Sequence, residues 1–193
     1  MSKILILNTS PRKRGLISQM LDVMAAELRA ERHEVKVIDV CGLAVRPCIG
    51  CMSCRSSGRC VLPADDAQRV LSLLQDSDAL IVGTPCYWGN MTGQLKVLFD
   101  RWVYGMMDEA PSGMPKPLHK GKRAVIVSTC TTVWPFNLLF RQSAGAVRAV
   151  GEVLRWSGFR IVGTVQKGGT RKRPVLTDAE KARCRRVVRK LNK

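Results

Sequence analysis

Four cysteines lie close together in one short segment and are the residues of this chain best suited to metal chemistry. Cys48, Cys51, Cys54 and Cys60 stand in the run PCIGCMSCRSSGRC, separated by two, two and five residues. Thiolates on so short a loop can all point inward around a soft metal centre. The spacing leaves three interpretations open: a [4Fe–4S] cluster, a set of free thiols, or a zinc ion. Zinc is the least favoured, because structural zinc sites usually have two cysteine pairs set further apart.

A second segment, residues 9–15 (TSPRKRG), offers a site for an anion. It lies between a short apolar run and a helical pattern, and a helix N-terminus presents free N–H groups and a partial positive charge to a phosphate. Ser10, Ser18 and Arg12 add further donors. The segment has neither the Gly-Lys-Ser/Thr of a P-loop nor a GxGxxG motif. It therefore suits a monophosphate, such as that of FMN, better than a dinucleotide; the alternative is a plain surface turn.

A third segment, residues 84–91 (TPCYWGNM), follows the nearly continuous apolar run DALIVG. Two aromatic side chains, a glycine and an amide at the end of a buried strand suit a flat heteroaromatic ring, whose polar edge backbone N–H groups can reach. The alternative is a small hydrophobic cluster under a loop. A Tyr-Trp pair at an exposed strand end favours the ligand.

The elements that position these segments alternate along the chain. Apolar runs predict five strands, at residues 3–7, 34–40, 78–83, 122–128 and 159–165. Helical spacing predicts five helices, at about 15–28, 66–74, 92–103, 135–157 and 177–191, with Asp65 or Asp66 and Thr177 as caps. The alternation predicts a parallel sheet with right-handed crossovers in a single domain, residues 1–193. Ligands bind such sheets at the carboxyl ends of the strands, which brings loops 8–18, 84–91 and 128–135 together.

These motifs resemble the NADPH-dependent FMN reductase family. The resemblance is carried by Ser10-Pro11-Arg12, the cysteine run, Asp65-Asp66 and the stretch GTPCYWGNMTGQLKVLFDR at 83–101, and it covers roughly residues 1–130. Within that family the cysteine spacing is similar to that of the iron–sulfur flavoproteins, which hold FMN beside a [4Fe–4S] cluster. The resemblance implies an α/β, flavodoxin-like, doubly wound five-stranded parallel sheet with helices on both faces. It also implies an FMN-binding oxidoreductase that uses NAD(P)H.

The resemblance further implies which residues hold each cofactor. Around the FMN phosphate it places Ser10, Arg12, Gly15, Leu16, Ile17 and Ser18. Around the isoalloxazine it places Pro85, Tyr87, Trp88, Gly89, Asn90 and Met91, with Thr129, Cys130 and Thr131 on the other side. A [4Fe–4S] cluster would take Cys48, Cys51, Cys54 and Cys60 as ligands and would relay single electrons to or from FMN. Leu16-Ile17 and Thr131-Thr132 depart from the polar residues and the glycine pair usual in the family. No side chain is assigned as a catalytic acid or base.

The formal net charge is +17, and residues 167–193 carry eleven Lys or Arg against Asp178 and Glu180. We interpret this segment as a solvated terminal helix. A redox-sensing nucleic-acid-binding protein is the alternative. The segment has no aromatic residue for base stacking, and no helix-turn-helix or zinc-finger spacing is present, so nucleic acid is not an expected partner.

The remaining expectations concern compartment and partners. Eight cysteines without a signal peptide predict a cytoplasmic protein, and no apolar run approaches the roughly 20 residues that cross a bilayer. The expected partners are a small-molecule electron acceptor (a quinone or a flavin) or a redox protein, and further copies of the chain in a dimer or tetramer with loop 105–121 as the contact. An electron-transfer protein that does not use NAD(P)H directly is the alternative.

Several single residues carry minor expectations. Cys86 and Cys130 are expected to flank the flavin, and Cys41 and Cys184 to pack in the interior. His33 and His119 are expected at the surface. Asp100 and Arg101 are expected to pair across a subunit interface.

Overall fold

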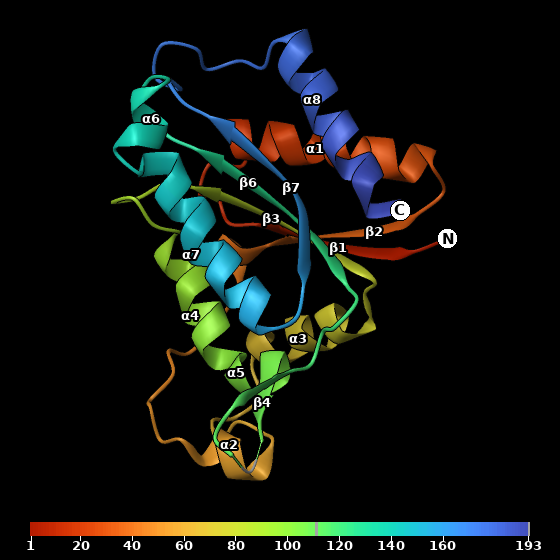
Figure 1. Cartoon of the computed structure of the whole chain (residues 1–193), viewed down its shortest axis with the longest axis vertical. Coiled ribbons are helices and arrows are strands. Elements are labelled where there is room, and N and C mark those ends of the chain that lie inside the picture. Colours follow the sequence, from red (N-terminus) through yellow and green to blue (C-terminus); the bar gives the residue numbers. More distant parts are fainter. Residues whose placement is uncertain (111, 193) are drawn as a thin grey trace.

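Five parallel strands form the central sheet of the structure, a computed structural model that describes residues 1–110 and 112–192 (Figure 1). They are β1 (Lys3–Asn8), β2 (Glu34–Asp39), β3 (Ala79–Pro85), β6 (Arg123–Thr129) and β7 (Arg160–Lys167). Their order is β2-β1-β3-β6-β7, and every neighbouring pair is parallel. The order reverses between β1 and β3, which is where a doubly wound sheet opens a crevice for a ligand. The predicted flavodoxin-like fold class is confirmed.

Helices cover both faces of the sheet, as Figure 1 shows. One face packs against α1 (Leu16–Ala30) and α8 (Asp178–Val188); the other packs against α3 (Asp66–Asp76), α4 (Gly93–Arg101) and α7 (Gln142–Trp156). Side chains of β1 alternate between the two layers, because successive residues of a strand point to opposite faces. Ile4 and Ile6 join the α1–α8 layer, whereas Leu5 and Leu7 join the other. β3 and β6 are buried along almost their whole length, as expected of central parallel strands.

The remaining elements are short. They are η1 (Val40–Gly42), α2 (Ser53–Ser57), α5 (Val103–Met106), β4 (Met107–Glu109), β5 (Pro115–Pro117), α6 (Phe136–Leu139) and η2 (Arg189–Asn192). β4 and β5 pair antiparallel, so the stretch 105–121, predicted to be a loop, contains a hairpin. In the part of the chain that the structure describes, no helix combines the length and the apolar character needed to span a bilayer.

The predicted helix over 135–157 is wrong in its continuity. Arg141 has a φ of 52°, and this left-handed residue separates α6 from α7. The turn lets the Asn137 amide donate to the Ser143 hydroxyl at 2.9 Å, which ties the two helices together. Neither glycine nor proline marks this break in the sequence, so the apolar periodicity alone runs across it.

The predicted caps are confirmed. Asp65 forms a capping box with Gln68 at the start of α3, and Thr177 forms one with Glu180 at the start of α8. Asp65 therefore fixes the point where the cysteine-bearing segment ends and α3 begins.

Candidate functional site

A cavity of about 770 Å³ opens at the carboxyl ends of the strands. Its volume lies in the range typical of small-molecule sites. Ten of the fifteen residues predicted to bind FMN line it: Ser10, Arg12, Gly15, Leu16, Ile17, Pro85, Tyr87, Thr129, Cys130 and Thr131. The structure thus brings together the loops after β1, β3 and β6, which are far apart in the sequence.

Gly15 shapes the end of the cavity where α1 begins. Its N–H donates to the carbonyl of Arg12 at 2.9 Å, and a Cβ there would lie 3.0 Å from Arg12 Cβ and 3.1 Å from the Arg12 carbonyl oxygen. Within the described part of the chain no side chain caps α1, so the first-turn N–H groups of Leu16 and Ile17 are available to an acceptor in the cavity. This is the arrangement that binds a phosphate at a helix N-terminus.

The two serines of this region hold the loop in shape. The Ser10 hydroxyl accepts from the Arg12 N–H at 3.2 Å and donates to the Arg12 carbonyl at 3.3 Å. The Ser18 hydroxyl donates to the same carbonyl at 3.2 Å and accepts from Asn8 Nδ2 at 3.0 Å. Ser18 does not line the cavity. Both hydroxyls therefore act first on the backbone around Arg12.

Three guanidinium groups lie around the cavity. Arg12 is among the predicted residues, whereas Arg14 and Arg171 were not predicted. No Asp or Glu is found among the described residues that line the cavity. The electrostatic character of the site therefore favours an anion. Sequence reasoning also missed Thr170 and Pro174, whereas Cys86 lines the cavity as expected.

Arg171 and Thr170 could have been found from the preference of ligands for the carboxyl ends of parallel strands, because the fifth predicted strand ends just before them. Both residues follow the carboxyl end of β7, at the same edge of the sheet. The basic composition of their segment instead suggested a solvated tail.

Fewer residues of the loop after β3 line the cavity than the sequence predicted. Tyr87 and Asn90 exchange two backbone hydrogen bonds, at 3.0 and 2.9 Å, around a two-residue turn. Trp88 and Gly89 in that turn have φ values of 53° and 69°, the left-handed pair that such tight turns require. The turn directs Trp88 outward, where its side chain is fully exposed.

Four predicted ring-binding residues consequently do not line the cavity: Trp88, Gly89, Asn90 and Met91. Asn90 and Met91 instead line a separate groove between α4 and α7. Gly89 packs against α7, where a Cβ on Gly145 would lie only 2.1 Å from the Gly89 carbonyl oxygen. Of the six residues of this loop that were predicted to hold the ring, only Pro85 and Tyr87 line the cavity, together with Cys86.

Two thiols flank the cavity, as the sequence suggested. The Cys86 N–H donates to the Thr129 carbonyl at 2.8 Å and extends the pairing of β3 with β6. Burial raises the pKa of the Cys86 thiol, and the nearby N–H groups of Gly89 and Asn90 offset this only in part. Cys130 is buried, and its thiol donates to the Thr132 carbonyl at 3.4 Å. Cys86 is therefore a neutral thiol at neutral pH.

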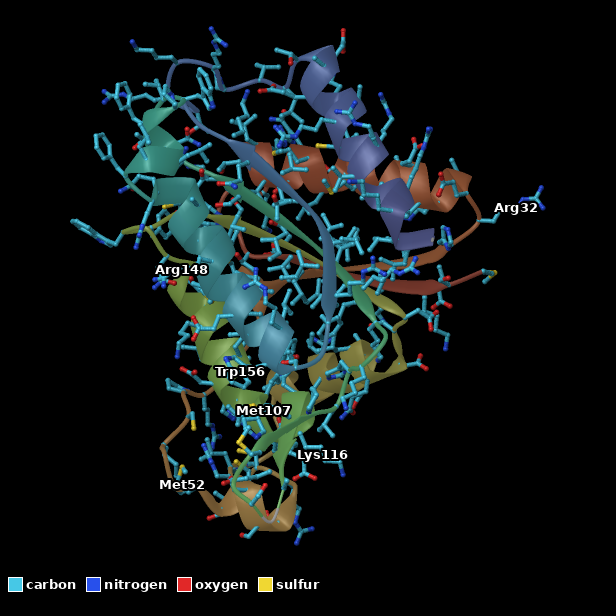
Figure 2. All side chains as sticks on the ribbon, in the orientation of Figure 1. Arg32, Met52, Met107, Lys116, Arg148 and Trp156 are labelled. Carbon is cyan, nitrogen blue, oxygen red and sulfur yellow. The ribbon has the colours of Figure 1, made fainter. Side chains whose placement is uncertain are left out.

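The four-cysteine segment lies at a different end of the molecule, beyond α5. In Figure 2, Met52 of this segment lies at the same end as Met107 and Lys116 of the β4–β5 hairpin. Arg55 Nη1 forms an ion pair with Glu109 Oε2 at 2.8 Å, which joins α2 to β4. None of the four cysteines lines the large cavity.

The four thiols differ in their surroundings. Cys48 and Cys51 are exposed, whereas Cys54 and Cys60 are partly buried. The N–H and the hydroxyl of Ser53 lower the pKa of the Cys51 thiol. Burial raises the pKa of Cys54, and the neighbouring sulfurs of Cys48, Cys60 and Cys51 raise it further. The thiols are thus close enough to influence one another electrostatically.

The donor chemistry of this segment fits an iron–sulfur cluster, which four thiolates commonly hold. Among residues 1–110 and 112–192, however, no three Cys, His, Asp or Glu side chains are gathered closely enough to hold a metal ion. The donor set supports a cluster, and the arrangement of the side chains does not by itself assign one.

Two single-residue expectations are wrong. Arg101 does not point to a subunit interface: it is buried, and its Nη1 donates to Asp65 Oδ2 and to the Arg46 carbonyl, both at 2.7 Å. His119 is buried rather than exposed, because its ring stacks on Phe159 and lies 2.9 Å from the Gly105 carbonyl oxygen. Burial lowers the pKa of His119.

Comparisons of the sequence with known proteins agree with one another. A family model described as NADPH-dependent FMN reductase matches residues 2–136. A protein named iron-sulfur flavoprotein from Archaeoglobus fulgidus is 39% identical over 99 residues, covering 51% of this chain and 48% of that protein. One of the same name from Methanosarcina thermophila is 36% identical over 102 residues, covering 52% of each chain. The chain thus spans about half the length of the curated relatives it matches.

Solved structures show the same fold at low sequence identity. The NAD(P)H:quinone oxidoreductase from Methanothermobacter marburgensis has a TM-score of 0.77 at 20% identity, covering 100% of this chain and 98% of the other. An azoreductase from Bacillus anthracis has a TM-score of 0.76 at 14% identity, covering 100% of both chains. At such identities the likeness shows the fold alone.

Proposed function

Since the chain belongs to the NADPH-dependent FMN reductase family, we propose that it is an oxidoreductase that binds FMN in the cavity at the carboxyl ends of the sheet. The observation that carries the proposal is the lining of this cavity. A helix N-terminus and three arginines lie on its surface together with Tyr87, the end of β3 and the polar end of β6. One lining therefore offers groups that suit both an anion and a flat ring.

In this proposal the phosphate binds at the start of α1. The N–H groups of Leu16 and Ile17 and the guanidinium of Arg12 supply its hydrogen bonds, and Arg171 adds positive charge from the β7 side. Ser10 and Ser18 hold the Arg12 carbonyl in place, and Gly15 keeps the approach free of a side chain.

The ring would bind between the β3 and β6 loops. Pro85, Cys86 and Tyr87 form one wall, and Thr129 to Thr131 form the other. FMN supplies the redox chemistry when bound, accepting a hydride from NAD(P)H or single electrons from a carrier. The residues of this chain bind and orient it, and no side chain is assigned as a proton donor.

We also propose that Cys48, Cys51, Cys54 and Cys60 hold a [4Fe–4S] cluster. The number of cysteines and their spacing support it, as do the names of the relatives. A second candidate function is an electron-transfer iron–sulfur flavoprotein that does not use NAD(P)H directly, and the relatives' names agree with it only in the words iron-sulfur flavoprotein. The proposed partners are a quinone, a flavin or a redox protein, and further copies of this chain in a homo-oligomer.

Fluorescence titration tests the FMN site. Free FMN fluoresces, so we expect quenching on binding to the purified apoprotein. Arg12→Ala and Arg171→Ala should each weaken binding by about tenfold or more, because each removes a charged partner of the phosphate. Arg148→Ala removes an exposed arginine of α7 outside the cavity lining and should bind FMN as the wild type does. Equal affinities for all four proteins would contradict the site.

Anaerobic reduction separates the two candidate functions. Rapid bleaching of the bound flavin by NADPH or NADH supports the reductase. No reaction with either nucleotide, together with rapid reduction by a reduced ferredoxin, supports the electron-transfer protein.

A further inference from the structure

Arg101 is a fully buried guanidinium that uses only part of its hydrogen-bonding capacity. Its side chain is 0% exposed. Its Nη1 donates to two oxygen atoms, whereas Nε and Nη2 find no hydrogen-bond acceptor among the described residues. Buried N–H groups without a partner are rare because their desolvation is not compensated, and charged ones cost the most. The unpaired side of this group therefore calls for an acceptor.

The paired side of Arg101 fastens both ends of the cysteine-bearing segment. The Arg46 carbonyl lies two residues before Cys48, and Asp65 lies five residues after Cys60. Asp65 Oδ2 also accepts from the Arg46 N–H at 3.1 Å, so that Arg46, Asp65 and Arg101 are all bonded to one another. A single side chain on α4 thus holds together the two ends of a segment that contains all four thiols.

Cys60 lies beside the same guanidinium. The Arg101 guanidinium interacts with the Cys60 sulfur as well as with the Asp65 carboxylate. Tyr104 lies near the same sulfur. Cys60 is therefore the sulfur of the segment that a buried positive charge adjoins.

We propose that Arg101 is a positioning residue for the metal centre proposed above. Its bonds to Arg46 and Asp65 close the segment, and its free N–H groups donate to the Cys60 sulfur when that sulfur is a metal-bound thiolate. The inference rests on the proposed [4Fe–4S] cluster. Hydrogen bonds and positive charge at a ligand sulfur stabilise the more negative, reduced cluster and so raise its reduction potential.

Two variants of Arg101 and one control test this role. Arg101→Lys keeps the charge but loses the forked donors, and Arg101→Gln loses the charge. Arg69→Gln is the control, because Arg69 pairs with Asp66 beside the same segment but is more than half exposed. Each protein is purified and reconstituted with iron and sulfide without oxygen. Three quantities are then measured: iron content, the rate of iron loss to a chelator, and the reduction potential by a redox titration followed by electron paramagnetic resonance.

We expect wild type and Arg69→Gln to share one reduction potential and one rate of iron loss. Both Arg101 variants should titrate at a lower potential and lose iron about tenfold faster or more, the usual consequence of losing an outer partner of a metal ligand. If Arg101→Gln does not fold, the potential and the rate of iron loss of Arg101→Lys alone test the role of Arg101. If Arg101→Lys loses iron faster but keeps the wild-type potential, Arg101 only closes the segment, and the proposed hydrogen bonds to the Cys60 sulfur are contradicted.

Failure of this inference is distinguishable from failure of the proposed function. A wild type that holds four irons beside Arg101 variants with an unchanged potential would overturn the role of Arg101 alone. A wild type that binds FMN but takes up no iron would overturn the cluster and the role of Arg101 with it.

Discussion

Gly15 illustrates how one residue position controls the proposed phosphate site. The loop after β1 folds back so tightly that a Cβ on Gly15 would lie only 3.0 Å from Arg12 Cβ. We expect an added methyl group to shift this loop slightly, and the loop borders the first-turn N–H groups proposed to bind the phosphate.

We predict that Gly15→Ala weakens FMN binding by roughly tenfold, the equivalent of about 1.4 kcal/mol. Gly42→Ala is the matched control, because a Cβ there has open space around it. Both are compared by flavin fluorescence titration, with circular dichroism to verify the fold. Wild-type affinity in Gly15→Ala would show that the phosphate does not bind against this loop.

At this scale, sequence reasoning succeeded for residues next to strand ends and failed where local backbone geometry decides. Pro85 and Tyr87 line the cavity because they lie at the carboxyl end of β3. Trp88 does not, because its positive φ turns it outward, and no residue type in the sequence signals a left-handed tryptophan. His119 is buried by contact with Phe159, a partner 40 residues away that periodicity cannot identify.

At the scale of elements, the start of α3 joins the cysteine segment to the core. Asp65 caps the helix through the Ala67 N–H at 2.8 Å and pairs with Arg101. Burial acts to raise the pKa of Asp65, but the hydrogen bonds from Arg46, Ala67 and Arg101 outweigh it, and the pKa is lowered. The Asp65 carboxylate therefore stabilises the folded protein at neutral pH.

We predict that Asp65→Asn lowers the free energy of unfolding at pH 7 by about 3–5 kcal/mol, because Arg101 is left buried without its counter-charge. Since the pKa of Asp65 is lower in the folded state, its stabilisation is complete above its ordinary value of about 4 and is lost as pH falls through the folded value. The difference between wild type and variant should therefore shrink below about pH 4. Urea denaturation at several pH values measures it; a difference independent of pH would contradict the role of this carboxylate.

The contact between α7 and the β3 loop depends on a single glycine. Gly145 lets the helix approach so closely that a Cβ would lie 2.1 Å from the Gly89 carbonyl oxygen. We predict that Gly145→Ala destabilises the protein by about 1–3 kcal/mol, as overpacking does, and displaces Tyr87 from the cavity wall. Gly93→Ala is the control, because a Cβ there meets no atom of the described residues within 4 Å. Thermal unfolding and FMN titration are the measurements, and a fully stable Gly145→Ala would refute the close approach.

The elements themselves could be predicted from strand and helix periodicity, since each long element buries a regular apolar stripe. The short elements could not. The β4–β5 hairpin has only three residues per strand, and the break at Arg141 interrupts a helix whose apolar pattern continues across it. Arg171 was missed because its segment is so basic that it was interpreted as solvated, although it directly follows β7.

At the scale of the whole molecule, charge and topology act together. The chain has a net charge of +17, and the described lining of its cavity holds arginines and no acidic residue. Such a field attracts anions and raises their association rates. Part of the basic C-terminal segment is already engaged, because Arg185 and Arg189 pair with Glu27 of α1.

We predict that the second-order rate of flavin reduction by NADPH falls by roughly tenfold between low and high salt, since salt screens this attraction. Reoxidation of the reduced flavin by a neutral quinone is the internal control and should change little. Stopped-flow absorbance follows both reactions. Equal salt dependence of the two rates would contradict electrostatic steering of the nucleotide.

The central claim is that this fold carries FMN in its cavity and an iron–sulfur cluster on its cysteine segment. The most direct measurement is an anaerobic ultraviolet–visible spectrum of freshly purified protein, with flavin, iron and acid-labile sulfide assayed on the same sample. We predict flavin bands with a broad cluster shoulder, about one FMN and about four irons per chain. Flavin without iron would leave the FMN site standing and contradict the cluster. A protein that neither retains FMN nor takes it up when it is added would contradict the central claim.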